Sequence, residues 1–212
     1  MRPYTKESIH NVLESKSSFK ADLNKEKKLH TLLDHYYNKH LKNYSFERVH
    51  DLKNQLAGVD VLFKQYSSGV TYTIDEKAQL DYINDDLPTF AFEISYLKNE
   101  NLKKGWLFDT TKKTDFYALV TAIYSDEPGR FTTCKITLVN RQKLLQFLEG
   151  KTITSNRFEN RNLPHGKTSI EELNDKREGY LYFSSFNKEE KPLNLILRLD
   201  FLIEQGIAKR LI

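Results

Sequence analysis

One stretch of this chain constrains its fold more than any other, because it predicts two strands joined by a tight turn. Residues 59–66 (VDVLFKQY) are rich in β-branched and aromatic side chains, and so are residues 70–82 (VTYTIDEKAQLDY). The intervening Ser67-Ser68-Gly69 is a typical signal for a hairpin turn. The sequence therefore predicts an antiparallel β-hairpin that spans both segments.

The segments on either side of this hairpin predict one α/β (α+β) domain with its own hydrophobic core. The chain has 212 residues, of which 39% are hydrophobic, and this length suits a single domain. Apolar residues at three- and four-residue spacing predict helices within residues 1–42. Further strands are predicted at residues 89–97, 131–140 and 178–185, and a helix is predicted at residues 141–150. Either a strand or a helix fits residues 45–56, 115–124 and 192–206.

Three charged side chains are expected to meet at one end of the hairpin. Residues two apart in a strand share a face, so Asp75 and Lys77 are neighbours. Pairing about the turn places Asp60 near Glu76, and a shift of one residue places Asp60 opposite Asp75. Two carboxylates on a rigid sheet suit a hard cation such as Mg²⁺ or Mn²⁺, and a lysine beside them can orient water or neutralise a phosphate. This trio predicts metal-dependent phosphodiester hydrolysis, with Asp60 and Asp75 as metal ligands. The alternative is a surface ion pair across the hairpin.

The order of these residues resembles that of the PD-(D/E)XK nuclease superfamily. Its two motifs are matched by residues 58–60 (GVD) and, after the turn, by residues 74–77 (IDEK) in an apolar strand. Val59 stands where the family often has a proline. The likeness extends over residues 45–125, through Glu93, the pair Gly105-Trp106 and the run Asp115-Phe116-Tyr117.

The resemblance implies a restriction-endonuclease-like core, in which a central mixed sheet is flanked by helices. The family's usual order is helix, three antiparallel strands, helix and strand. Here the segment after residue 77 looks more like a strand than a helix, which leaves the core helix without a clear place. We expect residues 1–212 to form a single domain. Its parts are a helical N-terminal segment (1–42), a nuclease-like core (45–150) and a C-terminal extension that completes the sheet (151–212).

Several further residues are expected to support this site. Gln79 shares the strand face of Asp75 and Lys77, and Glu93 lies in a strand from which it is expected to hold Lys77 or a second metal ion. By the resemblance, Glu47 is the nearest acidic residue that could join the site from the N-terminal side. Phosphate contacts are expected from lysines in the loops around the site, namely Lys103, Lys104, Lys112 and Lys113.

The resemblance also implies a substrate and a setting. The substrate is most often DNA, the setting is a phage or mobile element, and nucleases that cut both strands often act as homodimers. The net charge of +4 permits a nucleic-acid partner without requiring one. Two alternatives remain open. One is a catalytically inactive nucleic-acid-binding module with a nuclease-like fold, and the other is a protein-interaction module in which the hairpin charges are structural.

The sequence disfavours several other classes of protein. A single cysteine, Cys134, rules out an internal disulfide and a cysteine-based zinc site. The Walker A, GxSxG and GxGxxG patterns are missing, which disfavours common NTPase, serine hydrolase and dinucleotide-binding functions. No segment approaches 18 apolar residues, so we expect no transmembrane helix and a cytoplasmic location.

Overall fold

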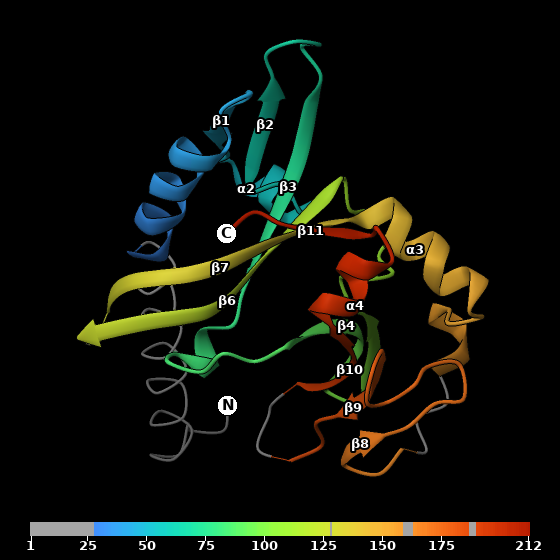
Figure 1. Ribbon diagram of the computed structural model, residues 1–212. Helices are drawn as coiled ribbons and strands as arrows, with labels where there is room; N and C mark the ends of the chain where they lie inside the picture. The colour runs from blue at the N-terminus through green and yellow to red at the C-terminus, as the bar shows by residue number, and fades with distance from the viewer. Residues whose placement is uncertain (1–27, 128, 159–162, 187–189) are drawn as a thin grey trace, which may run out of the picture.

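The computed structural model describes residues 28–127, 129–158, 163–186 and 190–212, which form two β-sheets and a few short helices (Figure 1). The mixed α+β class expected from the sequence is therefore confirmed. The larger sheet has six strands, ordered β1-β2-β3-β6-β7-β11, and the smaller has five, ordered β5-β4-β10-β9-β8. No helix among the described residues is both long enough and apolar enough to cross a membrane.

The strands of the larger sheet are β1 (Tyr44–Arg48), β2 (Val61–Gln65), β3 (Thr71–Ala78), β6 (Phe116–Glu127), β7 (Arg130–Asn140) and β11 (Ala208–Arg210). Those of the smaller sheet are β4 (Thr89–Lys98), β5 (Asn101–Lys104), β8 (Gly166–Thr168), β9 (Gly179–Phe183) and β10 (Lys191–Arg198). The helices are residues 28–40, α2 (Leu52–Leu56), α3 (Arg141–Gly150) and α4 (Leu199–Glu204), with single 3-10 turns at Leu80–Tyr82 and Ser155–Phe158.

The predicted hairpin is present as β2 and β3, with a register that fixes the candidate site. Val61 lies opposite Ile74, and the backbone N–H of Asp60 donates to the Ile74 carbonyl at 2.8 Å. Continuing the register by one step puts Asp60 opposite Asp75. The two carboxylates therefore lie on the same face of the larger sheet, because directly opposed residues of antiparallel strands share a face.

The connectivity of the larger sheet makes it mixed. Strands β1, β2 and β3 form an antiparallel meander, and the chain then leaves the sheet. It returns as β6, which pairs in parallel with β3, and continues into β7 and finally β11, both antiparallel to their neighbours. The segment between β3 and β6 contains β4 and β5 of the smaller sheet and no α-helix.

Each face of the larger sheet has its own hydrophobic core. On one face, the helix at residues 28–40 buries Leu29, Leu33 and Tyr37 at four-residue spacing against Ile74 of β3. The other face packs against the smaller sheet and against α3 and α4. Strand β6 contributes alternately to the two cores, as expected of a strand buried on both faces.

The flanking layers differ from the expected pair of helical layers. A helical layer covers one face, but on the other face a second sheet stands beside α3 and α4 (Figure 1). Alternating burial of Leu193, Leu195 and Leu197 explains this difference, because that period-two pattern forms a strand that pairs with β4 and β9. Residues 151–212 thus supply β8, β9 and β10 to the smaller sheet and β11 to the larger.

Three segments that fitted either a strand or a helix are resolved by the structure. Residues 45–56 contain both, since β1 is followed by α2, whose N-cap Asp51 accepts a hydrogen bond from the Asn54 N–H. Residues 192–206 likewise contain β10 and then α4, and residues 116–127 are the strand β6. Of the expected helical segment 1–42, residues 28–40 are helical, and residues 1–27 lie outside the described residues.

Candidate active site

Two carboxylates, Asp60 and Asp75, are held side by side by the start of β2 and the middle of β3. Asp75 is 1% exposed, and the Asp60 carboxylate accepts a hydrogen bond from the Glu76 backbone N–H at 2.8 Å. That bond ties the Asp60 side chain to the strand carrying Asp75. The backbone therefore fixes the pair, and little side-chain freedom remains to be lost on binding a ligand.

The two oxygens of Asp75 have different surroundings. Oδ1 accepts from Lys77 Nζ at 2.5 Å, whereas Oδ2 is buried and, within the described residues, accepts no hydrogen bond. A buried carboxylate oxygen without a partner is unfavourable, because its hydration has been lost without replacement. A bound cation, or a proton carried by a neighbouring acid, would satisfy it.

The Asp60 carboxyl supplies such a neighbour. The pKa of Asp60 is raised from 3.8 to about 7, chiefly by burial and then by the negative charge of Asp75, while the Glu76 N–H and Lys77 oppose the change. A proton on Asp60 can be shared with Asp75, as in other pairs of adjacent carboxyls. A divalent cation would take the place of that proton and allow both groups to ionise. Oxygen donors in this arrangement suit a hard ion such as Mg²⁺ or Mn²⁺.

The third residue, Lys77, extends along the same strand face and is held from two sides. Its ammonium group contacts Asp75 and also lies 5.6 Å from the centre of the Trp106 ring. Trp106 in turn packs edge-on against Tyr117, with ring centres 4.9 Å apart, and the Tyr117 hydroxyl accepts from Arg141 Nε at 3.0 Å. Trp106 thus connects the position of Lys77 to the core of the smaller sheet.

A glycine allows the chain to pass close behind the carboxylates. Gly58 has a φ of +75°, and a Cβ atom there would lie 2.5 Å from Thr114 Oγ1 and 3.2 Å from Asp75 Oδ2. The Thr114 hydroxyl donates to the Gly58 carbonyl at 2.8 Å, and the Lys112 ammonium donates to the Leu56 carbonyl at 2.8 Å. The loop before β6 is thereby fixed against the turn that presents Asp60.

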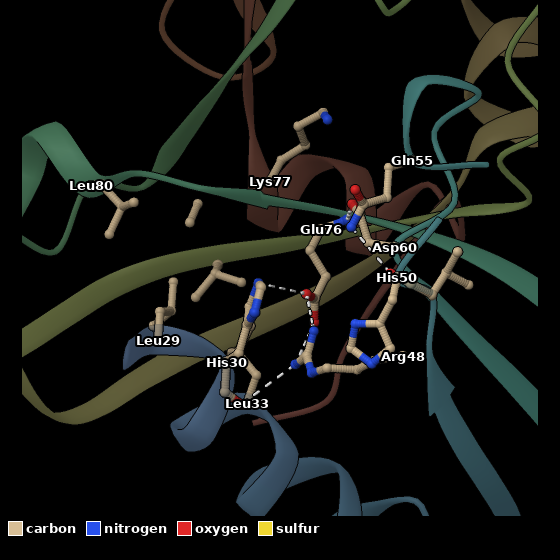
Figure 2. Close-up of a pocket in the computed structure, with 13 residues that line it drawn as sticks. Leu29, His30, Leu33, Arg48, His50, Gln55, Asp60, Glu76, Lys77 and Leu80 are labelled. Atoms are coloured by element: carbon tan, nitrogen blue, oxygen red, sulfur yellow. Dashed lines mark hydrogen bonds and ion pairs between the residues drawn. The ribbon is translucent and has the colours of Figure 1, made fainter. Parts of the chain in front are cut away.

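Asp60 and Lys77, but not Asp75, border a cavity of about 590 Å³ that opens along β3 beyond its pairing with β2. Figure 2 shows Lys77 and Glu76 pointing to opposite sides of this strand. Asp60, Lys77 and Gln55 line one side, and the opposite wall contains residues of the helix at 28–40 and of the segment after β1. The volume is within the range of about 300–1,000 Å³ typical of ligand sites.

Glu76 belongs to an ionic network on the helix face, and its members Glu76, Arg48 and His30 also line this cavity. It accepts from Arg48 Nη1 at 2.8 Å, and His30 Nε2 lies 3.8 Å away (Figure 2). It also accepts from the Tyr37 hydroxyl at 2.7 Å. Arg48 also binds Asp34 through Nε at 2.7 Å. These bonds satisfy the Glu76 carboxylate and tie the helix to β1 and β3, so we assign it a structural role.

The three secondary candidates, Gln79, Glu93 and Glu47, lie on different elements around Asp60, Asp75 and Lys77. Gln79 follows β3 and donates its amide to the Thr89 carbonyl at 2.9 Å, which ties it to the start of β4. Glu93 is half-buried in β4 of the smaller sheet and does not line the cavity. Glu47 is exposed in β1 opposite Leu62, on the sheet face of Asp60 but two residues further along the strand.

The four lysines expected to contact phosphates occupy two places. Lys112 and Lys113 lie beside α2 and the turn that precedes Asp60, where the Lys113 backbone N–H donates to the Ala57 carbonyl at 2.8 Å. Lys103 and Lys104 are exposed on β5 at the edge of the smaller sheet. The Lys112 side chain packs beside Gly58, as the Asp75 carboxylate does.

The residues present fit one hard cation with an incomplete protein ligand set. Within the described ranges, no group of three or more His, Cys, Asp or Glu side chains forms a metal cluster. Mg²⁺ requires fewer protein ligands, since it usually keeps several waters and binds one or two carboxylates plus substrate phosphates. Comparison with family models, curated proteins and solved structures finds no match to this chain.

Proposed function

We propose that this protein is a divalent-metal-dependent nuclease, in which Asp60 and Asp75 bind the metal ion and Lys77 acts on the water and the scissile phosphate. The observation that carries the proposal is the buried Oδ2 of Asp75, which has no hydrogen-bond partner among the described residues. Asp60 is the neighbouring carboxylate, and the other oxygen of Asp75 binds Lys77. Most buried carboxylate oxygens have a hydrogen-bond partner, so an unpartnered one beside a second carboxylate favours a bound cation.

The connectivity of the fold supports the same proposal. A helix, an antiparallel meander and a parallel fourth strand follow one another in the order typical of PD-(D/E)XK nucleases. Asp60 immediately precedes the second strand, and Asp75 and Lys77 lie in the third, as the resemblance implies. The second sheet replaces the core helix of that family between the third and fourth strands.

The residues divide the chemistry between them. A bound Mg²⁺ or Mn²⁺ would lower the pKa of a coordinated water and stabilise negative charge on a phosphoryl oxygen. Asp60 and Asp75 would hold that ion beside the cavity that Asp60 and Lys77 line. Lys77 places a positive charge beside the carboxylates, where it orients the attacking water and neutralises the phosphate. DNA is the proposed substrate, on the basis of the family resemblance.

A cleavage assay tests this proposal. The full chain is incubated with labelled duplex DNA, single-stranded DNA and RNA, in Mg²⁺, Mn²⁺ or EDTA, beside Asp75→Asn and Lys77→Met. We expect metal-dependent cutting that both variants lose, while Lys64→Met, which changes an exposed lysine of β2, keeps the wild-type rate. Thermal melting of each variant verifies that it is folded. If no substrate is cut and Mg²⁺ does not raise the melting temperature, the proposal is wrong and an interaction module is favoured.

A further inference from the structure

A second hollow lies on the face of the larger sheet opposite to the carboxylates. It has a volume of about 520 Å³ and is bordered by the end of the helix at residues 28–40, the strands of the larger sheet, the start of α3 and the C-terminal segment. Its position follows from the alternation of β3. Tyr72 and Ile74 line this hollow, whereas Asp75 and Lys77 point to the other face. It also shares no lining residue with the cavity that Asp60 and Lys77 border, so the two hollows are separate.

Aromatic rings form much of the surface of this hollow, which we call the aromatic groove. Tyr44 of β1, Tyr72 of β3 and Phe116 of β6 follow one another across the sheet, with ring centres 6.5 Å and then 5.5 Å apart. All three side chains are only half-buried, so part of each ring faces solvent. Partly exposed rings of this kind can stack with the flat faces of unpaired bases.

The border of the aromatic groove is basic. Lys42, Lys143 and Lys209 line it, and none of the described residues that line it is an aspartate or glutamate. Lys42 and Lys143 donate hydrogen bonds to backbone carbonyls of Asn38 and Gly206, at 3.4 and 3.1 Å. Those acceptors are neutral carbonyl groups, so these hydrogen bonds do not offset the positive charge of the two lysines. The groove thus complements a ligand that carries both aromatic rings and negative charge.

We propose that the aromatic groove binds single-stranded nucleic acid, with one or two bases against the rings and the adjoining phosphates on the lysines. An unpaired strand fits better than a duplex, because the rings lie within a hollow that only bases with free faces can enter. Backbone contacts by lysine together with stacking give affinity with little sequence preference. This inference goes beyond the nuclease proposal and does not depend on catalysis.

Fluorescence anisotropy with a labelled oligothymidylate of roughly 10 nucleotides tests this site. The full chain is titrated in EDTA, so that the carboxylate pair holds no metal ion. Wild-type affinity should fall with salt, with a logarithmic slope of about −2 for three phosphate contacts. Tyr72→Ala should weaken binding by roughly tenfold, and Tyr72→Trp should restore it by offering a stacking surface.

A charge reversal provides a second variant that does not alter the core. Lys209→Glu, on an exposed residue of β11, should weaken binding by roughly tenfold and make the salt slope shallower by about 0.7. The matched control Lys176→Glu changes the net charge by the same amount at an exposed residue that does not line the groove. This variant should bind as the wild type does. If Tyr72→Ala does not fold, Lys209→Glu alone decides.

Three results would overturn the inference. One is a wild-type chain that does not bind the oligonucleotide at low salt. Another is unchanged affinity in both Tyr72→Ala and Lys209→Glu. The third is competition by duplex DNA or by polyglutamate that equals competition by the unlabelled single strand, since this would indicate general attraction of polyanions. None of these results bears on metal-dependent cleavage, which the assay in EDTA does not measure.

Discussion

Replacing Asp60 by asparagine is expected to stabilise the metal-free protein at neutral and alkaline pH. The new amide group keeps an oxygen to accept the Glu76 N–H, and its NH₂ can donate to Asp75 in place of the shared proton. The substitution removes the charge that Asp75 and burial make unfavourable. Function would then explain why a destabilising acid occupies this position.

The size of the effect follows from the pKa of Asp60. Its folded value of about 7 lies above its ordinary value of 3.8, a difference of about 3 units. The stabilisation of the neutral form is complete below about pH 4 and is lost as pH rises through 7. At about 1.36 kcal/mol per unit, the ceiling is about 4 kcal/mol. Partial exposure of the side chain reduces this, so we expect about 1–3 kcal/mol.

Urea denaturation in EDTA at pH 5 and pH 8 measures this change. The unfolding free energy of Asp60→Asn, measured relative to that of the wild type, should be higher at pH 8 than at pH 5. Asp81→Asn, which alters an exposed aspartate in the 3-10 turn after β3, should show no such shift. Adding Mg²⁺ should stabilise the wild type and not the variant. If Asp60→Asn loses stability equally at both pH values, the shared-proton explanation of the pair is wrong.

Three further changes test other contacts of the site. In urea denaturation, Gly58→Ala should destabilise the protein by about 2 kcal/mol or more, since it adds a close contact to an unfavourable φ. Gly69→Ala should cost only about 1 kcal/mol, because Gly69 has a φ of +70° but open space around it. Arg48→Ala should cost about 3–5 kcal/mol by leaving buried Glu76 without its cationic partner, and adding Glu76→Gln should recover part of the loss in the same assay. If Lys77 is catalytic as proposed, Trp106→Ala should lower the cleavage rate by roughly tenfold through loss of its contact with Lys77, and Trp106→Phe should lower it less. Equal rates for the two Trp106 variants would argue against that contact.

The local part of the fold could be predicted from the sequence because short-range patterns determine it. The hairpin, the strands over residues 89–97 and 131–140 and the helix at residues 141–150 are present with nearly the expected bounds. The register of the hairpin needed the shift of one residue, because its loop is centred between Ser67 and Ser68. An even number of loop residues places the symmetry point between two residues, and composition alone does not specify that number.

The second sheet could not be predicted, because its pairing is non-local. Strand β4 pairs with β10, roughly a hundred residues later in the chain, and neither strand carries a local signal for its partner. The strand-like look of the segment after Lys77 was nevertheless informative, since that segment contains β4 and β5. Its apolar alternation indicated strands, although it gave no indication of the sheet they join.

The candidate site was predictable only in its strand residues. The alternation rule placed Asp75 and Lys77 on one face, and the hairpin brought Asp60 to them. The contact between Lys77 and Trp106 joins β3 to the turn after β5 and has no local signature. Gly58 was recognisable as a turn residue, but the threonine hydroxyl that lies against it comes from a loop more than fifty residues away.

Binding of Mn²⁺, followed by electron paramagnetic resonance, tests most directly whether Asp60 and Asp75 form one metal site. We expect the wild type to bind one ion, and Asp60→Asn and Asp75→Asn to weaken that binding by roughly 10- to 100-fold. Lys77→Met should bind at least as well as the wild type, because it removes a competing positive charge beside the carboxylates. A wild-type chain that binds no Mn²⁺, or an Asp75→Asn variant that binds it equally well, would contradict the proposed metal site.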